Sequence, residues 1–205
     1  MLSLQTIQPN TLELLKQLAS RPELAQTRLV GGTALALQYG HRQSIDLDFF
    51  GAMPEDKDEL IDMVKQIGNV TVTNKSKSIV QTVINNVKVD FVDYSRYVWI
   101  DEPIHGDGFV LASDKDIAAM KVNAIIGRGT RKDFIDLYVL LQHYSLTEIM
   151  EFYKQKYPEF SEYRALLSMT YFEDAEMQDM PKMFIDIPWD EMKSTIIQAV
   201  KAYQK

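Results

Sequence analysis

A glycine pair that opens a helix, followed by a strand that carries two aspartates, constrains this chain more than any other feature of its sequence. The segment before Gly31 and Gly32 is short and apolar, and a helical segment follows them. In residues 44–50, apolar residues alternate with Asp46 and Asp48, which is the period of a strand with one apolar face. The order strand, turn, helix, strand therefore predicts two carboxylates that point the same way beside a glycine turn.

The two aspartates are candidate metal ligands. Strand residues i and i+2 share a face at roughly 6 to 7 Å, so both can hold one ion, whereas two unpaired acids so close repel each other. Asp90, in a predicted strand, would add a third carboxylate and allow a two-metal site. The chain has no cysteine and three scattered histidines, so oxygen ligands and Mg²⁺ or Mn²⁺ are expected. The alternative is that Asp46 and Asp48 lie on the solvent face of an edge strand.

The turn Gly31-Gly32-Thr33 is a candidate nucleotide phosphate site. Glycines remove side chains where the backbone must approach phosphates, and the helix that begins near Thr33 offers free amides and a positive dipole end. Without the acids that follow it, such a turn is more often an ordinary connection.

Composition limits the class of protein. A chain of 205 residues with 46% hydrophobic residues can bury one substantial core, or a larger domain with a smaller one packed on it. No apolar run approaches the roughly 18 to 20 residues that span a bilayer, and the first residues lack the order of a signal peptide, so a cytoplasmic protein is expected. The net charge of −7 argues against a surface coated with nucleic-acid-binding charge, yet it allows a local basic patch.

The rest of the chain predicts an α/β or α+β protein. Strands are expected at residues 70–73, 79–84 and 87–92, with Asn85-Asn86 as a two-residue hairpin turn because asparagine tolerates positive φ. Proline and glycine in residues 103–108 indicate a crossing loop, and the chain beyond them reads as helical. We therefore expect a division of the chain near residue 110.

A lysine and an aspartate interrupt the apolar faces of two predicted helices. Ser113 and Asp116 match a capping pair at the start of the first helix, and Lys121 lies within its apolar stripe. Asp136 lies in a second helix that has almost no polar face. Three interpretations are open: Lys121 and Asp136 form a buried ion pair, Lys121 contacts a triphosphate while Asp136 orients it, or the lysine snorkels to solvent.

Residues 117–132 contain four basic residues and no acid. Arg128, Arg131 and Lys132 are expected to project from a turn between the two helices, where a polyanion can dock on an acidic protein. The alternative is an ordinary solvated surface. For His41 and Arg42, contact with a phosphate is conceivable, and ordinary solvent contact in a loop is the default expectation.

These segments together resemble the AbiEii/AbiGii-type nucleotidyltransferases of the DNA polymerase β-like superfamily. The likeness extends over about residues 28 to 141. It rests on Gly31 to Leu35, His41-Arg42 and Asp46 to Phe50, followed by the second motif DIAAMKVNAIIGRGTRKDFIDLY from Asp116. The resemblance implies a nucleotidyltransferase fold: a mixed β-sheet flanked by helices in a catalytic domain (residues 1–110), then a helical C-terminal domain (residues 111–205) that completes the active site.

The resemblance also implies roles for individual residues. Gly32 and Thr33, with Gly31, would hold nucleotide phosphates, and Asp46 and Asp48 would bind Mg²⁺ or Mn²⁺. Further implied site residues are Asp90, Lys121 and Asp136.

The implied function is metal-dependent transfer of a nucleoside monophosphate from a nucleoside triphosphate to a hydroxyl acceptor. The acceptor would be an RNA end, such as a tRNA end, and the acid-free basic stretch predicts that it docks on Arg128, Arg131 and Lys132. The protein would act as a toxin whose partner is an antitoxin protein. Two alternatives are a nucleotidyltransferase for small molecules, similar to those that modify aminoglycosides, and a catalytically idle binding module.

Overall fold

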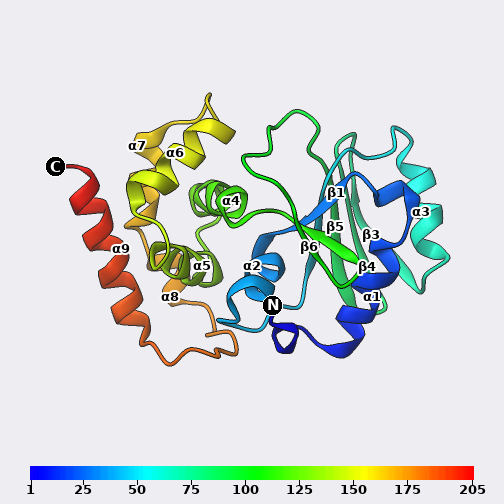
Figure 1. The fold of residues 1–205 in the computed structure, drawn as a ribbon, viewed down its shortest axis with the longest axis horizontal. Coiled ribbons are helices and arrows are strands. Elements are labelled where there is room, and N and C mark those ends of the chain that lie inside the picture. The colour runs from blue at the N-terminus through cyan, green and yellow to red at the C-terminus, as the bar shows by residue number, and fades with distance from the viewer.

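A seven-stranded mixed sheet is the centre of the protein, which a computed structural model describes over residues 1–205 (Figure 1). The strand order is β3-β4-β5-β2-β1-β7-β6, in which β2 is parallel to β5 and β1 to β7, while the other neighbours are antiparallel. The predicted mixed sheet is therefore confirmed. The strands are β1 (Thr27–Val30), β2 (Leu47–Gly51), β3 (Val70–Lys75), β4 (Ile79–Ile84), β5 (Val87–Asp93), β6 (Ile104–Gly106) and β7 (Phe109–Leu111).

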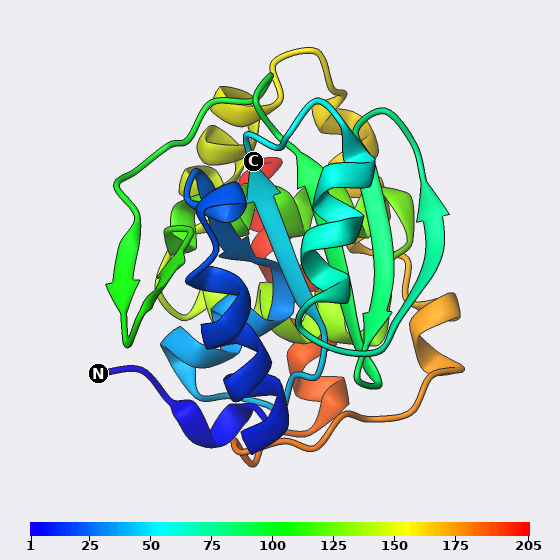
Figure 2. The same ribbon diagram turned by 90° about the vertical axis from the view of Figure 1, so that its right-hand side faces the viewer.

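Two amphipathic helices cover one face of the sheet. Figure 2 shows α1 (Pro9–Ala19) and α3 (Lys57–Lys65) in front of the strands, with the helices that follow the sheet behind them. Residues on the covered face, such as Val89 and Phe91, are buried, whereas their neighbours Asp90 and Val92 are only partly buried. Removing apolar side chains from water stabilises this side of the sheet. The period of two in β5 therefore directs Asp90 toward the side that α1 and α3 leave open.

The helices after the sheet pack around α4. This helix lies against α2 (Gly31–Tyr39) of the first part and against α5, α6 and α7 of the second. Its start confirms the predicted capping pair, because the Asp116 N–H donates to Ser113 Oγ at 3.1 Å. The helices are α4 (Asp114–Gly127), α5 (Arg131–Leu141), α6 (Leu146–Lys156), α7 (Glu162–Met169), α8 (Glu173–Glu176) and α9 (Trp189–Tyr203), and two 3₁₀ helices span Leu4–Thr6 and Pro22–Leu24. No helix combines the length and the apolar character needed to cross a membrane.

The turns differ in how well sequence predicted them. Asn85 and Asn86 have φ of 49° and 67°, which confirms the tight hairpin between β4 and β5. The crossing loop expected at residues 103–108 is instead a short hairpin of β6 and β7, and β7 joins the sheet beside β1. Similarly, β2 begins at Leu47 rather than at residue 44, and the Ile45 side chain is 48% exposed instead of facing the core.

One hydrophobic core runs through the whole molecule. A single cluster of 48 buried residues includes Leu15 of α1, Val89 of β5 and Ile196 of α9. The division that we propose near residue 110 falls inside β7. We retain a catalytic part and a helical part as a description of the chain, with the cleft between them as the site of interest.

Candidate active site

Two carboxylates lie side by side on neighbouring parallel strands. The register of β2 and β5 places Asp48 directly opposite Asp90. Burial, together with the nearby Asp90 and Asp46, raises the pKa of Asp48 to about 6. Such a pair is costly because two desolvated carboxylates of like charge disfavour ionisation. A bound cation removes this cost, so the arrangement favours a positively charged ligand.

Asp90 has a partner on one oxygen only. Its Oδ2 accepts a hydrogen bond from Gln81 Nε2 at 2.9 Å and lies 3.1 Å from Lys88 Nζ. Its Oδ1 is buried and has no partner. Because an unpartnered buried carboxylate oxygen is unfavourable, this atom fits the role of a cation ligand. Oxygen donors of this kind are those that Mg²⁺ and Mn²⁺ prefer.

The third predicted carboxylate, Asp46, lies outside β2 but lines the same cavity as Asp48. Asp46 precedes β2, and its backbone carbonyl accepts a hydrogen bond from the Thr33 hydroxyl. As the side chains stand, no group of three histidine, aspartate or glutamate residues is arranged to hold a metal ion. The donor set therefore fits one cation between Asp48 and Asp90, with Asp46 on the wall of the neighbouring cavity.

The glycine turn allows side chains to approach the backbone closely. Gly31 has φ of +71°, and a Cβ there would lie only 2.5 Å from Oδ2 of Asp48. A Cβ on Gly32 would overlap the guanidinium of Arg42. Thr33 is 1% exposed, and its hydroxyl is occupied by Ser44 Oγ at 2.8 Å and by the Asp46 carbonyl. The glycines thus hold Asp48 and Arg42 against the start of α2, while the side chain of Thr33 secures the turn and does not line the cavity.

A buried ion cluster forms the wall opposite the sheet. Asp136 is fully buried. Its carboxylate accepts hydrogen bonds from Arg42 Nε at 2.7 Å, Arg42 Nη2 at 2.8 Å and His41 Nε2 at 2.8 Å, and it forms an ion pair with Lys121 Nζ at 2.5 Å. Lys121 also contacts Asp133 Oδ1 at 3.0 Å. Burial opposes ionisation of Asp136, but Arg42 and Lys121 outweigh it and hold the pKa of Asp136 well below its ordinary value. Burial likewise lowers the pKa of Lys121, but Asp136 and Asp133 outweigh it, so the lysine stays charged.

This cluster resolves part of what the sequence left open. Lys121 is 3% exposed, so it does not snorkel to solvent. It forms an ion pair with Asp136 and also lines the cavity that contains Asp48, so the structural and nucleotide-contacting interpretations are compatible. The default expectation of solvent contact for His41 and Arg42 was wrong: both are buried, with 1% and 2% exposed. Only their place between the glycine turn and the aspartate strand could have indicated this.

The predicted basic patch is divided in the structure. Arg128 remains 63% exposed while its guanidinium contacts Asp133, and Lys132 lies on the same cavity wall. Arg131 turns away: its Nε donates to the carbonyl of Ala175 at 2.9 Å, its guanidinium lies 5.0 Å from the ring centroid of Trp189, and its side chain is 13% exposed. The three cations therefore do not form one surface.

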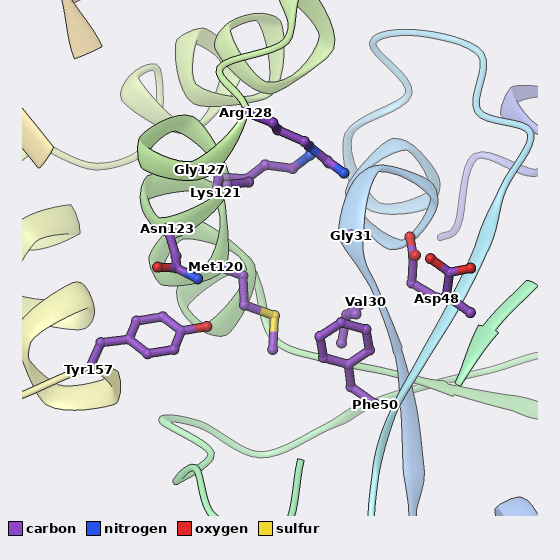
Figure 3. Close-up of a pocket in the computed structure, with 12 residues that line it drawn as sticks. Val30, Gly31, Asp48, Phe50, Met120, Lys121, Asn123, Gly127, Arg128 and Tyr157 are labelled. Atoms are coloured by element: carbon purple, nitrogen blue, oxygen red, sulfur yellow. The ribbon is translucent and has the colours of Figure 1, made fainter. Parts of the chain in front are cut away.

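Two adjoining cavities meet at Asp48, Lys121 and Arg128. One, of about 250 Å³, has no hydrophobic residue in its wall. The other, of about 370 Å³, has an end lined by Phe50 and Tyr157. Figure 3 shows Lys121, Arg128 and Gly31 at one end of this second cavity and Phe50 and Tyr157 at the other. A cleft with a cationic, polar end and an aromatic end matches a ligand that has phosphates and a base.

A family model described as "Nucleotidyl transferase AbiEii toxin, Type IV TA system" matches residues 13–204. This chain belongs to that family. The resemblance seen in the two sequence motifs is thereby confirmed, and this AbiEii chain is a nucleotidyltransferase of a toxin–antitoxin family.

Similar proteins agree with the AbiEii assignment. The uncharacterized protein aq_aa25 of Aquifex aeolicus is 34% identical over 183 residues, which cover 85% of this chain and 86% of that protein. The crystal structure of JHP933 from Helicobacter pylori has a TM-score of 0.56 at 17% identity and covers 96% and 92% of the two chains. The nucleotidyltransferase toxin MenT4 from Mycobacterium tuberculosis has a TM-score of 0.53 at 15% identity and covers 91% and 79%. At these low identities the two structures show that the AbiEii chain has the nucleotidyltransferase fold.

Proposed function

We propose that this protein transfers a nucleoside monophosphate from a nucleoside triphosphate to the terminal hydroxyl of an RNA, in a reaction that depends on Mg²⁺ or Mn²⁺. The observation that carries the proposal is the pair Asp48 and Asp90, with its unpartnered buried oxygen, between a polar cationic cavity and an aromatic one. In this reaction the acceptor hydroxyl loses its proton to solvent and its oxygen forms a bond to the α-phosphorus. The bond between the α-phosphorus and the oxygen that bridges to the β-phosphate breaks, and pyrophosphate leaves.

Asp48 and Asp90 are the proposed metal ligands, and Asp46, which lines the same polar cavity as Asp48, would serve a second ion. The metal would neutralise phosphate charge and assist ionisation of the attacking hydroxyl. Without a cation, the three aspartates would repel a triphosphate. The raised pKa of Asp48 agrees with a site that is strained in the absence of positive charge.

The polar cavity is the proposed triphosphate site. Its wall includes Gly32 at the start of α2, whose free amides and dipole suit an anion, and the cations Lys121, Arg128 and Lys132. This changes the role that the sequence suggested for Arg128 and Lys132, because both line the cavity that contains the glycine turn. The base would then lie toward Asn123 and Tyr157 in the second cavity.

The toxin role agrees with the family, whereas the RNA acceptor is our own proposal. An RNA end, for example that of a tRNA, remains the proposed acceptor, and it would approach Asp90 over the side of the sheet that α1 and α3 leave open. We propose that the protein acts as a toxin held in check by an antitoxin protein, which agrees with the toxin–antitoxin family.

The test is transfer of label from each of the four α-labelled nucleoside triphosphates to total cellular RNA, with products separated by size. Label should enter RNA in Mg²⁺ and not in chelator. Asp48→Asn and Asp90→Asn should abolish transfer, whereas the control Asp62→Asn, at a surface residue of α3, should retain it. Label in small molecules alone would identify a small-molecule transferase, and absence of any transfer would identify an idle binding module.

A further inference from the structure

A second charged cleft lies at the rim of the sheet, outside the candidate active site. It has a volume of about 680 Å³ and forms where β2 and β5 end, beside the turn that joins β3 to β4. Three cations, Lys57, Lys77 and Arg96, line it together with the ring of Tyr97. Lys57 is buried and its Nζ donates to the carbonyl of Pro54, so the exposed cations of the cleft are Lys77 and Arg96.

Two of these cations are free to bind a ligand. Lys77 and Arg96 are exposed, and neither forms an ion pair. The cleft also contains the acids Glu55 and Asp93, so its wall carries one more positive than negative charge. A hydrogen bond from Ser95 holds the pKa of Asp93 below its ordinary value, with a contribution from Arg96. The cleft therefore offers separate cations to an anion, which suits individual phosphates along a strand.

Aromatic side chains connect this cleft to the active site. Tyr97 of the cleft stacks on Tyr94 at 4.4 Å between ring centroids, and its ring lies 5.3 Å from that of Tyr157, which lines the active-site cavity. Tyr94 in turn lies 5.2 Å from Phe50 of the same cavity. Tyr97 remains 38% exposed, so part of its ring is available for stacking against a base.

The separation of the two sites corresponds to a short length of RNA. Asp90 lines the active-site cavity and Asp93 lines the cleft at the end of β5, three residues or about 10 Å farther along the strand and on its opposite face, so an RNA that joins the two sites passes around the end of β5. Stacked nucleotides rise about 3.4 Å each, so about three nucleotides span this distance. Nucleic-acid strands are commonly held by cations that follow the backbone and by aromatic rings that stack on bases.

We propose that this rim cleft binds the acceptor RNA about three nucleotides upstream of its reactive 3′ end, with Lys77 and Arg96 on backbone phosphates and Tyr97 against a base. The inference rests on the proposed function and adds to it a substrate class: single-stranded RNA ends of more than about three nucleotides.

The test compares two synthetic single-stranded RNAs, of two and ten nucleotides, that share the same 3′-terminal dinucleotide. The wild type should have a lower KM for the longer RNA. Lys77→Ala/Arg96→Ala should lose this advantage, while the KM values for the dinucleotide and for the nucleoside triphosphate stay unchanged. The control Lys16→Ala/Lys201→Ala removes two exposed cations of α1 and α9 and should behave as the wild type.

Salt dependence gives an independent readout of the same contacts. Loss of two phosphate contacts should reduce the logarithmic salt slope of binding to the longer RNA by about 1.4, at about 0.7 per contact. A fourfold rise in salt should then weaken wild-type binding about sevenfold more than binding by the variant.

The outcomes separate this inference from the proposed function. If the wild type transfers to RNA and the variant keeps the wild-type length dependence and salt slope, the rim cleft is not an RNA site although the proposed function stands. An equal effect of the control variant, or an equal effect on the dinucleotide, would also overturn the inference. If the wild type transfers nucleotide neither to the two synthetic RNAs nor to cellular RNA, the proposed RNA acceptor is wrong, and the rim cleft is then not an RNA site either.

Discussion

Removal of single charges from the buried ion cluster should destabilise the protein in an order that the contacts determine. Lys121→Met keeps an apolar side chain and leaves each carboxylate with an arginine: Asp136 retains two hydrogen bonds from Arg42, and Asp133 retains Arg128. The cost is therefore that of charged hydrogen bonds, about 1.5 to 3 kcal/mol. Asp136→Asn instead leaves the buried cations Arg42 and Lys121 without their shared anion, which costs about 3 to 5 kcal/mol.

Thermal unfolding converts these costs into shifts of Tm. In a chain of this length each kcal/mol lowers Tm by about 2 to 4 °C, so Lys121→Met should lower it by about 3 to 12 °C and Asp136→Asn by about 6 to 20 °C. The control Lys115→Met is on the same helix as Lys121 and breaks only the exposed ion pair with Asp101, so its Tm should stay near that of the wild type. The assay is calorimetry or circular dichroism of the four proteins at pH 7.

Nucleotide binding, measured well below each Tm, then separates stability from function. Because Lys121 also lines the cavity, Lys121→Met should bind a fluorescent nucleoside triphosphate more weakly than the wild type and Lys115→Met. A larger loss of stability in Lys121→Met than in Asp136→Asn would show that Asp136 is not the centre of the cluster. Unchanged nucleotide affinity would restrict Lys121 to a structural role.

The remaining predictions concern the carboxylate pair, the glycine turn and the cations. Because the pKa of Asp48 is raised to about 6, the folded protein without metal should lose up to about 3 kcal/mol of stability as pH rises from about 4 to 6. Asp48→Asn lacks this loss, so it should melt at a higher temperature than the wild type at pH 7.5 in chelator. Gly31→Ala must adopt a positive φ and displace the carboxylate of Asp48, so it should cost about 1 to 3 kcal/mol in denaturant unfolding and reduce transfer. Lys132→Ala, which removes an exposed cation of the polar cavity and breaks no ion pair, should raise the KM for the nucleoside triphosphate in steady-state transfer assays while Tm stays near that of the wild type. Arg131→Ala should show the reverse, a lower Tm with little change in KM, because its guanidinium packs on α8 and α9. An equal effect of both basic variants on KM would contradict the division of the basic patch.

Local signals explain which parts of the fold were predictable. The strands β4 and β5 alternate apolar and polar residues, and Asn85-Asn86 suits the turn between them, so pattern and turn chemistry agree. The hairpin of β6 and β7 was missed because its strands have three residues each and because β7 is held by pairing with the distant β1. Pairing of this kind leaves almost no periodicity in the sequence itself.

The candidate active site was also predictable only where its residues are close together in the sequence. The aspartates and the glycine turn are adjacent in the chain, so a single strand–turn–helix–strand pattern identified them together. Arg42, by contrast, contacts Asp136 across 94 residues of sequence, and nothing near Arg42 indicates a buried partner. The sequence also grouped Arg128, Arg131 and Lys132 by proximity, but the helix start at residue 131 directs Arg131 toward α8 and away from the other two.

Binding of Mn²⁺ is the most direct measurement of the central claim, that Asp48 and Asp90 form the metal site of a nucleotidyltransferase. Electron paramagnetic resonance can follow a Mn²⁺ titration of the wild type, Asp48→Asn, Asp90→Asn and the control Asp62→Asn, each with a nonhydrolysable nucleoside triphosphate present. The structure predicts that the wild type and Asp62→Asn bind Mn²⁺ equally, and that both substitutions in the pair abolish the protein-dependent binding while the proteins remain folded. Wild-type Mn²⁺ affinity in folded Asp48→Asn and Asp90→Asn would contradict the assignment.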